Sequence, residues 1–278
     1  MMYEPRRLLD DIQFGESPRW RGDRLWFSDI LDGKVYTVDM DGRRTVVADL
    51  GDARPSGIGF LADGDALVVD MARPGIVRLA SDGTFHVHAD LADVTIALLN
   101  DMAVDRDGNA YVGSTGRNYF TGEAEARPAN IILVRPDGTY AVVAEDVITP
   151  NGPVITADAF TFIVAESHLH RLLAFEILPD RTLGARRVWA HLGDVEPDGI
   201  AIDREGAIWV ASQSTQECVR VLEGGQVTDR VAFGHTVIAC ALGGPDGNTL
   251  FVFGVMGEPA GPIRSSILDI VRVTVPAW

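Results

Sequence analysis

Residues 197–212, PDGIAIDREGAIWVAS, contain the pattern that decides the fold. An acidic residue, Asp198, is followed by a glycine, a short apolar run, a turn with the sequence DREG, and a second apolar run that contains Trp209. Short apolar runs on both sides of a glycine-containing turn are typical of a β-hairpin. The stretch therefore predicts two short antiparallel strands, with an oxygen-bearing side chain at the start of the first.

The same pattern recurs along the chain, each time ending at an aromatic or apolar residue ten or eleven positions after its first residue. We call the first residues the channel positions: Glu16, Ser56, Asn100, Asn151, Asp198 and Cys240, separated by 40, 44, 51, 47 and 42 residues. Repeats of about 40–50 residues with several short strands are typical of propeller blades. The sequence predicts an all-β, six-bladed β-propeller that forms a single domain over residues 1–278. Residues 3–11, YEPRRLLDD, are expected to pair with the last blade, since ring closure removes exposed strand edges.

Composition and charge narrow the class of protein. The chain has 278 residues, of which 46% are apolar and 23% charged, as in soluble globular proteins. Its net charge of −16 argues against a nucleic-acid partner, because phosphate binding needs a basic face. No apolar run is long enough to span a membrane, and residues 1–14 lack the apolar core of a signal peptide. With only two cysteines, a cytoplasmic location is expected. We expect a small-molecule partner and a monomer or small homo-oligomer.

The channel positions should lie at one height and face the central channel if the repeats are equivalent. Four of them offer carboxylate or amide oxygens, and two carboxylates in a narrow channel are costly unless a cation neutralises them. Such a donor set suits one divalent cation, with Ca²⁺ favoured and Zn²⁺ or Mn²⁺ as alternatives. Asn, Asp or Ser before Gly is also common in turns. Their coincidence in one register of the repeat favours the metal site.

Four stretches together resemble the SMP-30/gluconolactonase/luciferin-regenerating-enzyme family over essentially the whole chain: GESPRW (15–20), NDMAVDRDGNAYVGS (100–114), PNGPVI (150–155) and the opening stretch. The resemblance implies a six-bladed propeller with one divalent cation in its channel. It implies Glu16, Asn151 and Asp198 as metal ligands, and Asn100 as a ligand or a substrate contact. It also implies Asp198 as the general base, and in related phosphotriesterases the matching aspartate is a candidate nucleophile.

The connections between the second and third strands of the blades are expected to surround the end of the channel that holds the channel positions, which we call the mouth. These connections contain Asp29, Met71, and residues 115–119, 167–168 and 213–214. Within them, Arg117 is a candidate substrate contact or a solvated loop arginine. Asp101 is a candidate for orienting the Asn100 amide, and His235 for reaching the mouth. Leu98 occupies the position where sugar-lactone members of the family carry an arginine. A more apolar substrate than a plain sugar lactone is therefore expected.

These features predict a metal-dependent hydrolase, most simply a lactonase with Asp198 as base. Phosphotriester or ester hydrolysis on the same fold is the nearest alternative within that class. A metal-assisted lyase that stabilises an enolate is a second alternative. A calcium-binding propeller without catalysis is a third, because a propeller fold alone does not determine function.

Overall fold

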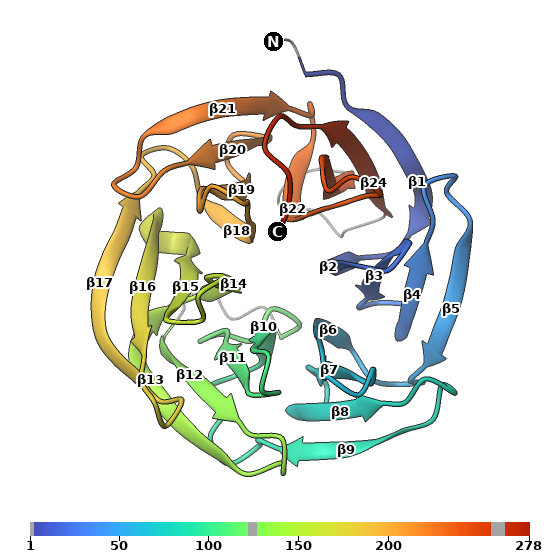
Figure 1. The fold of residues 1–278 in the computed structure, drawn as a ribbon. Coiled ribbons are helices and arrows are strands. Elements are labelled where there is room, and N and C mark those ends of the chain that lie inside the picture. The colour runs from blue at the N-terminus through green and yellow to red at the C-terminus, as the bar shows by residue number, and fades with distance from the viewer. Residues whose placement is uncertain (1–2, 122–126, 257–264) are drawn as a thin grey trace.

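Six four-stranded antiparallel sheets surround a central channel in the computed structural model, which describes residues 3–121, 127–256 and 265–278 (Figure 1). The six-bladed, all-β prediction is therefore confirmed. The one helical element in these ranges is a short 3-10 turn, η1 (Ser167–Leu169). None of the three described ranges contains a helix with the length and apolarity that a bilayer crossing requires.

The strands of each blade run from the channel outward. Blade 1 has β2 (Gly15–Arg21), β3 (Arg24–Asp29), β4 (Lys34–Val38) and β5 (Arg44–Asp49). Blade 2 has β6 (Pro55–Phe60), β7 (Ala66–Asp70), β8 (Gly75–Leu79) and β9 (Phe85–Asp90). Blade 3 has β10 (Leu99–Val104), β11 (Ala110–Ser114), β12 (Pro128–Val134) and β13 (Tyr140–Ile148).

Blades 4 and 5 follow the same order, whereas blade 6 uses both ends of the chain. Blade 4 has β14 (Pro150–Ile155), β15 (Thr161–Glu166), β16 (Arg171–Ile177) and β17 (Leu183–His191). Blade 5 has β18 (Pro197–Ile202), β19 (Ile208–Ser212), β20 (Glu217–Val221) and β21 (Val227–Ala232). Blade 6 has β22 (Thr236–Gly243), β23 (Thr249–Met256), β24 (Ser265–Arg272) and, outermost, β1 (Arg6–Ile12).

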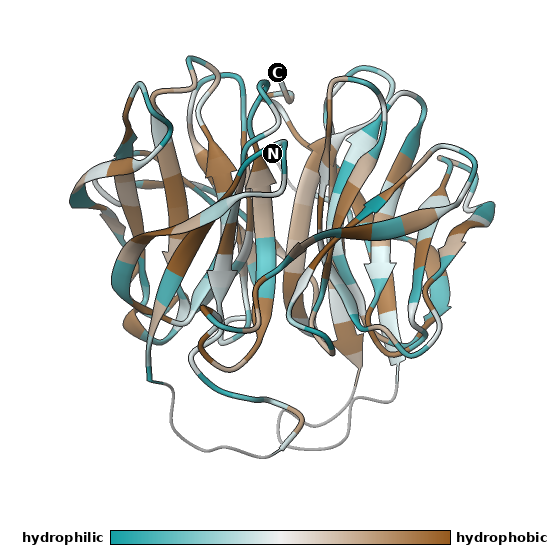
Figure 2. Ribbon diagram, turned by 90° about the horizontal axis from the view of Figure 1, so that it is seen from below, coloured by the Kyte–Doolittle hydropathy of each residue, from teal (hydrophilic) through white to brown (hydrophobic). Residues whose placement is uncertain are grey.

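Strand β1 closes the ring by pairing antiparallel with β24, as expected for the leading segment. Its last residue, Ile12, is 1% exposed and belongs to an apolar cluster with Phe27 of blade 1 and Phe253 of blade 6. In the side view of Figure 2, apolar segments line the strands in the interior, and both labelled chain ends lie at one end of the ring. The closing strand therefore joins blade 6 to the core as well as to its own sheet.

Neighbouring inner strands approach each other closely just after the channel positions. A Cβ on Gly199 would lie 2.7 Å from the Cα of Ala239, and one on Gly57 would lie 2.7 Å from the backbone nitrogen of Met102. Real Cβ atoms do not approach other atoms so closely, so a side chain here would push the strands apart. The glycine that follows several channel positions is thus explained by strand packing around the channel.

Blade 6 departs from the sequence alignment of the repeats. Phe251 pairs with Ala241, whereas Trp209 pairs with Ala201, and the connecting turn of blade 6 is two residues longer. The residue equivalent to Asp198 is therefore Ile238, and the assignment of Cys240 to a channel position is wrong. Blade 6 contributes an apolar side chain at this level, which is 4% exposed.

Replacing Ile12 tests how much the closing strand stabilises the ring. Ile12→Ala removes buried methylene groups and leaves a cavity, so we expect the free energy of unfolding to fall by about 2–4 kcal/mol. Val46→Ala is the control: Val46 also lies on an outermost strand but is 50% exposed, and its change should stay within about 0.5 kcal/mol. Chemical denaturation would measure both, and equal losses would contradict a structural role for β1.

Candidate functional site

Four oxygen-bearing side chains converge in the channel, and we call them the donor cluster: Glu16, Asn100, Asn151 and Asp198. Each is the second residue of its inner strand, in β2, β10, β14 and β18. The Asn100 amide donates to Oδ1 of Asn151 at 3.0 Å. The side chain of Asn151 in turn hydrogen-bonds Asp198, and the charge of Asp198 acts directly on Glu16. The structure thus brings together all four residues that the sequence suggested as ligands.

Asp198 is 4% exposed and is held by Gln213, whose Nε2 donates to Oδ2 at 2.5 Å. Burial raises the pKa of Asp198 to about 7, although the hydrogen bonds from Gln213 and Asn151 act in the opposite direction. Nearby negative charges, among them that of Asp101, add to the rise. Asp198 is therefore a carboxyl group that changes its charge near neutral pH in the metal-free protein.

Glu16 shares this electrostatic environment. Burial raises the pKa of Glu16 well above its usual range, and the charges of Asp198 and Asp101 raise it further. The backbone N–H of Ser17 donates to Oε2 of Glu16 at 3.0 Å, which partly opposes the rise. No ion pair in the described ranges includes Glu16 or Asp198. The charge of Arg19 lowers the pKa of Glu16 only in part, so the two carboxylates keep raised pKa values without an ion pair in the described ranges.

The donor cluster fits a hard divalent cation. In the described part of the chain, no group of three or more His, Cys, Asp and Glu side chains is arranged to hold a metal. The donor cluster has a different composition, with two carboxylates and two amides, and oxygen donors of this kind are what Ca²⁺ prefers. A cation there would also offset the buried negative charge. Glu16, Asn100, Asn151 and Asp198 are therefore the residues that could hold a metal.

Arg19 and Asp101 form an ion pair across the channel, directly behind the donor cluster. Nη2 of Arg19 lies 2.9 and 3.0 Å from the two carboxylate oxygens of Asp101 and also donates to the carbonyl oxygen of Met102 at 2.9 Å. The Ser17 hydroxyl donates to Asp101 as well, at 2.5 Å. The Asn100 amide instead donates to Asn151 and to a backbone carbonyl. Asp101 thus holds Arg19 and Ser17, rather than the Asn100 amide.

Sequence reasoning missed Arg19, although its position carried a signal. It lies three residues after Glu16, where the other blades have Gly59, Ala103, Val154, Ala201 and Ala241. A long cationic side chain in a position that is otherwise small or apolar marks a departure from the repeat. The structure shows that this departure supplies the partner of Asp101.

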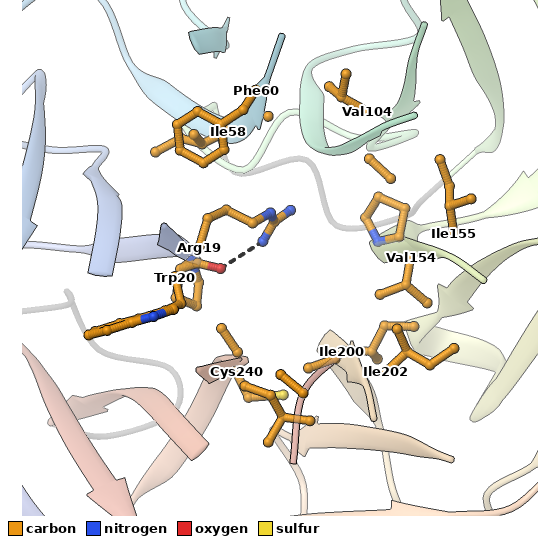
Figure 3. A pocket seen from close by; sticks show the side chains of 18 residues that line it. Arg19, Trp20, Ile58, Phe60, Val104, Val154, Ile155, Ile200, Ile202 and Cys240 are labelled. Carbon is orange, nitrogen blue, oxygen red and sulfur yellow. Dashed lines mark hydrogen bonds between the residues drawn. The ribbon is translucent and has the colours of Figure 1, made fainter. Parts of the chain in front are cut away.

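Beyond Arg19, toward the ends of the inner strands, the channel widens into a cavity of about 390 Å³ (Figure 3). Figure 3 shows the Arg19 side chain extending into a ring of mostly apolar residues that includes Trp20, Phe60 and Val154. Ala277, near the C-terminus, also lines this cavity. The Arg19–Asp101 pair therefore lies between the donor cluster and a second, apolar part of the channel.

The connection after β11 reaches over the donor-cluster end of the channel. The first residue of this connection, Thr115, is fixed beside Leu98, since its N–H donates to the Leu98 carbonyl oxygen at 2.8 Å. The Arg117 guanidinium lies over the Tyr119 ring at 4.5 Å, and the charge of Asp198 reaches the Tyr119 hydroxyl. Arg117 thus lies at the mouth, as the sequence suggested, together with Tyr119.

Other predicted rim residues differ in what they do. Asp29 is 1% exposed and accepts backbone hydrogen bonds from Gln13 and Phe14 at 2.9 Å, so it stabilises a turn. Met71 is 4% exposed and packs in an apolar cluster. His168 lies beside Thr149, with Nδ1 at 2.6 Å from its hydroxyl oxygen.

Leu98 and His235 are not brought to the donor cluster. Leu98 is 6% exposed and packs in the same apolar cluster as Met71, so it presents little surface to the mouth. Nε2 of His235 lies 3.4 Å from Oδ2 of Asp269 on β24, and Asp269 also pairs with Arg7 on β1. The partners of His235 therefore come from the outer strands of its blade.

Comparison with known proteins gives consistent results. A sequence model described as "SMP-30/Gluconolactonase/LRE-like region" matches residues 14–254. Regucalcin of Gallus gallus is 24% identical over 257 residues, covering 87% of this chain and 83% of regucalcin. Pentonolactonase XacC of Haloferax volcanii is 26% identical over 279 residues, covering 92% of this chain and 86% of the lactonase. The solved structure of a gluconolactonase from Xanthomonas campestris superposes with a TM-score of 0.79 and 25% identity, covering 99% of this chain and 90% of that one.

A double-mutant cycle on Arg19 and Asp101 tests the ion pair behind the donor cluster. Their side chains are 25% and 9% exposed, so Arg19→Met and Asp101→Asn should show a coupling free energy of about 1–3 kcal/mol in chemical denaturation with chelator present. The control pair is Arg43 and Asp41, which are 75% and 68% exposed and should couple by less than about 1 kcal/mol. A coupling no larger than that of the control would contradict a structural role for the pair.

Proposed function

The chain belongs to the SMP-30/gluconolactonase/LRE-like family, and we propose that it is a metal-dependent hydrolase that opens a small lactone ring. The observation that carries this proposal is the donor cluster, where two carboxylates with raised pKa values lie beside two amides and form no ion pair with a described side chain. The similarity of the whole chain to a pentonolactonase and to a gluconolactonase supports lactones as the substrate class.

We assign the metal to Glu16, Asn100, Asn151 and Asp198, with Ca²⁺ as the native ion. A bound divalent cation would supply Lewis acidity toward a carbonyl oxygen. The Asn100–Asn151 hydrogen bond fixes the two amides relative to each other, and Gln213 fixes the Asp198 carboxylate. These contacts hold the oxygen atoms in place before any ligand arrives, which reduces the cost of ordering them.

Asp198 is the proposed general base. Burial raises the pKa of Asp198 to about 7 in the metal-free protein, and a bound cation would lower it by favouring the charged carboxylate, so the base assignment rests on the place of Asp198 in the donor cluster. Its Oδ2 is engaged by Gln213, so the other carboxylate oxygen is the one proposed to accept a proton from the attacking water. Arg117, at the mouth, is proposed to contact the substrate.

A pH-indicator assay would test the proposed reaction on sugar lactones, alkyl lactones, aryl esters and a phosphotriester, each with Ca²⁺, Zn²⁺, Mn²⁺ or chelator. We expect acid release from lactones that is lost with chelator and reduced by about 10²–10⁴-fold in Asp198→Asn. Glu145→Gln, an exposed carboxylate on β13, is the matched control and should retain the activity.

The panel also separates the alternatives. Acid release from the phosphotriester or the aryl esters alone would replace lactonase by another hydrolase of the same fold. No release from any compound, while calorimetry still detects bound metal, would contradict the hydrolase proposal and favour a lyase or a calcium-binding protein.

Metal binding should depend on pH with a defined sign. The cation competes with protons for Asp198 and Glu16, so affinity should fall as the pH drops through the Asp198 pKa of about 7, approaching about tenfold per pH unit for each proton displaced. Gln213→Leu removes a hydrogen bond that favours the charged carboxylate, and it should move this midpoint to higher pH. Calorimetric Ca²⁺ titrations would measure both, and an affinity that does not change across this range would contradict the assignment of Asp198 as a ligand.

A further inference from the structure

Two aromatic side chains at the mouth have no role in the chemistry described so far. Tyr119 and Phe120 follow Arg117 in the connection after β11, and these residues are 42% and 43% exposed. Large apolar side chains with this exposure cost free energy in water unless something covers them. Their position relative to the donor cluster therefore decides whether a substrate could cover them.

Contacts from three blades place both rings at the mouth. The Arg54 guanidinium lies over the Phe120 ring at 3.8 Å, and Arg54 is two residues before Ser56 on the inner strand of blade 2. On the other side, the charges of Asp198 and Glu196 in blade 5 reach the Tyr119 hydroxyl. The base of the connection is fixed beside Leu98 in blade 3 through Thr115. Tyr119 and Phe120 thus lie between blades 2 and 5, over the donor-cluster end of the channel.

The turn that carries the rings is held by its own hydrogen bonds. The Phe120 N–H donates to Oδ1 of Asn118 at 2.9 Å, and the Thr115 hydroxyl donates to the carbonyl oxygen of Arg117 at 2.6 Å. Each ring has an arginine over one face, Arg54 for Phe120 and Arg117 for Tyr119. Because the cations occupy only one side of each ring, the exposed remainder is apolar surface.

We propose that Tyr119 and Phe120 bind an apolar substituent of the substrate, so that the preferred substrate is a lactone carrying an aryl or alkyl group; this inference rests on the hydrolase function proposed above. Exposed apolar side chains also occur in the corresponding connections of other blades, at Leu31 and Leu169, which are 41% and 43% exposed. A polyhydroxylated ring would leave these surfaces in contact with polar groups and would gain little from them.

Three lactones with the same five-membered ring would test the proposal: γ-phenyl-γ-butyrolactone, γ-butyrolactone and xylono-1,4-lactone, assayed with Ca²⁺. We expect kcat/KM for the phenyl lactone to exceed that for γ-butyrolactone by at least about tenfold, as apolar contacts of one ring allow. Tyr119→Ala and Phe120→Ala should each lower this ratio by about tenfold, whereas Tyr119→Phe, which keeps the ring, should preserve it.

Phe85→Ala is the matched control, because Phe85 is an aromatic residue of similar exposure, 45%, on the outermost strand of blade 2. It should leave the ratio unchanged. A preference for xylono-1,4-lactone, or a ratio that neither alanine variant changes, would overturn the inference while the hydrolase proposal stands.

A binding measurement keeps the two proposals separate if no lactone is hydrolysed. Saturation-transfer NMR would detect contact between the phenyl protons of γ-phenyl-γ-butyrolactone and the protein. Contact that is lost in Tyr119→Ala and Phe120→Ala would support the apolar site, while the lack of hydrolysis would by itself contradict the lactonase proposal. Contact that is absent, or unchanged in both variants, would overturn the inference directly.

Discussion

The close approach of neighbouring inner strands is the constraint on which the site depends. Gly199 packs against the backbone at Ala239, and Gly57 packs against the backbone at Met102, with room for a hydrogen atom only. Because the strands come this close just after the channel positions, the side chains at those positions also come close. The hydrogen bond between Asn100 and Asn151 joins residues that are 51 positions apart in the chain. The geometry of the donor cluster is thus a result of backbone packing.

Charge balance in the channel follows from the same crowding. Glu16, Asp198 and Asp101 act on one another electrostatically, and Arg19 forms its ion pair with Asp101. One guanidinium cannot balance three carboxylates in a region with little water, so the remaining charge must be neutralised by protons or by a cation. The ion pair also divides the channel by polarity. The donor cluster lies on one side of it, and the apolar cavity into which Arg19 extends in Figure 3 lies on the other.

Repeat spacing and turn chemistry were sufficient to predict the fold, because each blade carries its own hairpin signal. Asp203, for example, accepts hydrogen bonds from the backbone of Glu205 and Ala207, which closes the turn within residues 197–212. The donor cluster was predictable because its members share one register. The sequence alignment of blade 6 with the other repeats was wrong because the turn between β22 and β23 is two residues longer, and composition does not reveal a longer turn. The position of Arg19 departs from the repeat, but its pairing with Asp101 was not predictable, since Asp101 is 82 residues away and belongs to another blade. The direction of the His235 side chain was not predictable either. It depends on Asp269, which lies on β24, far from His235 in the sequence.

The pairing of β1 with β24 has a consequence for how the molecule assembles. Residues 6–12 leave the ribosome before the rest of the propeller, but their partner strand spans residues 265–272. During synthesis, five sheets can form from consecutive segments while the first strand waits without its partner. The final step must close a loop of nearly the whole chain, which is slow because of the chain entropy that such a contact removes. Until then the nascent protein presents open strand edges at both ends of the arc, and protection from aggregation matters most during this interval.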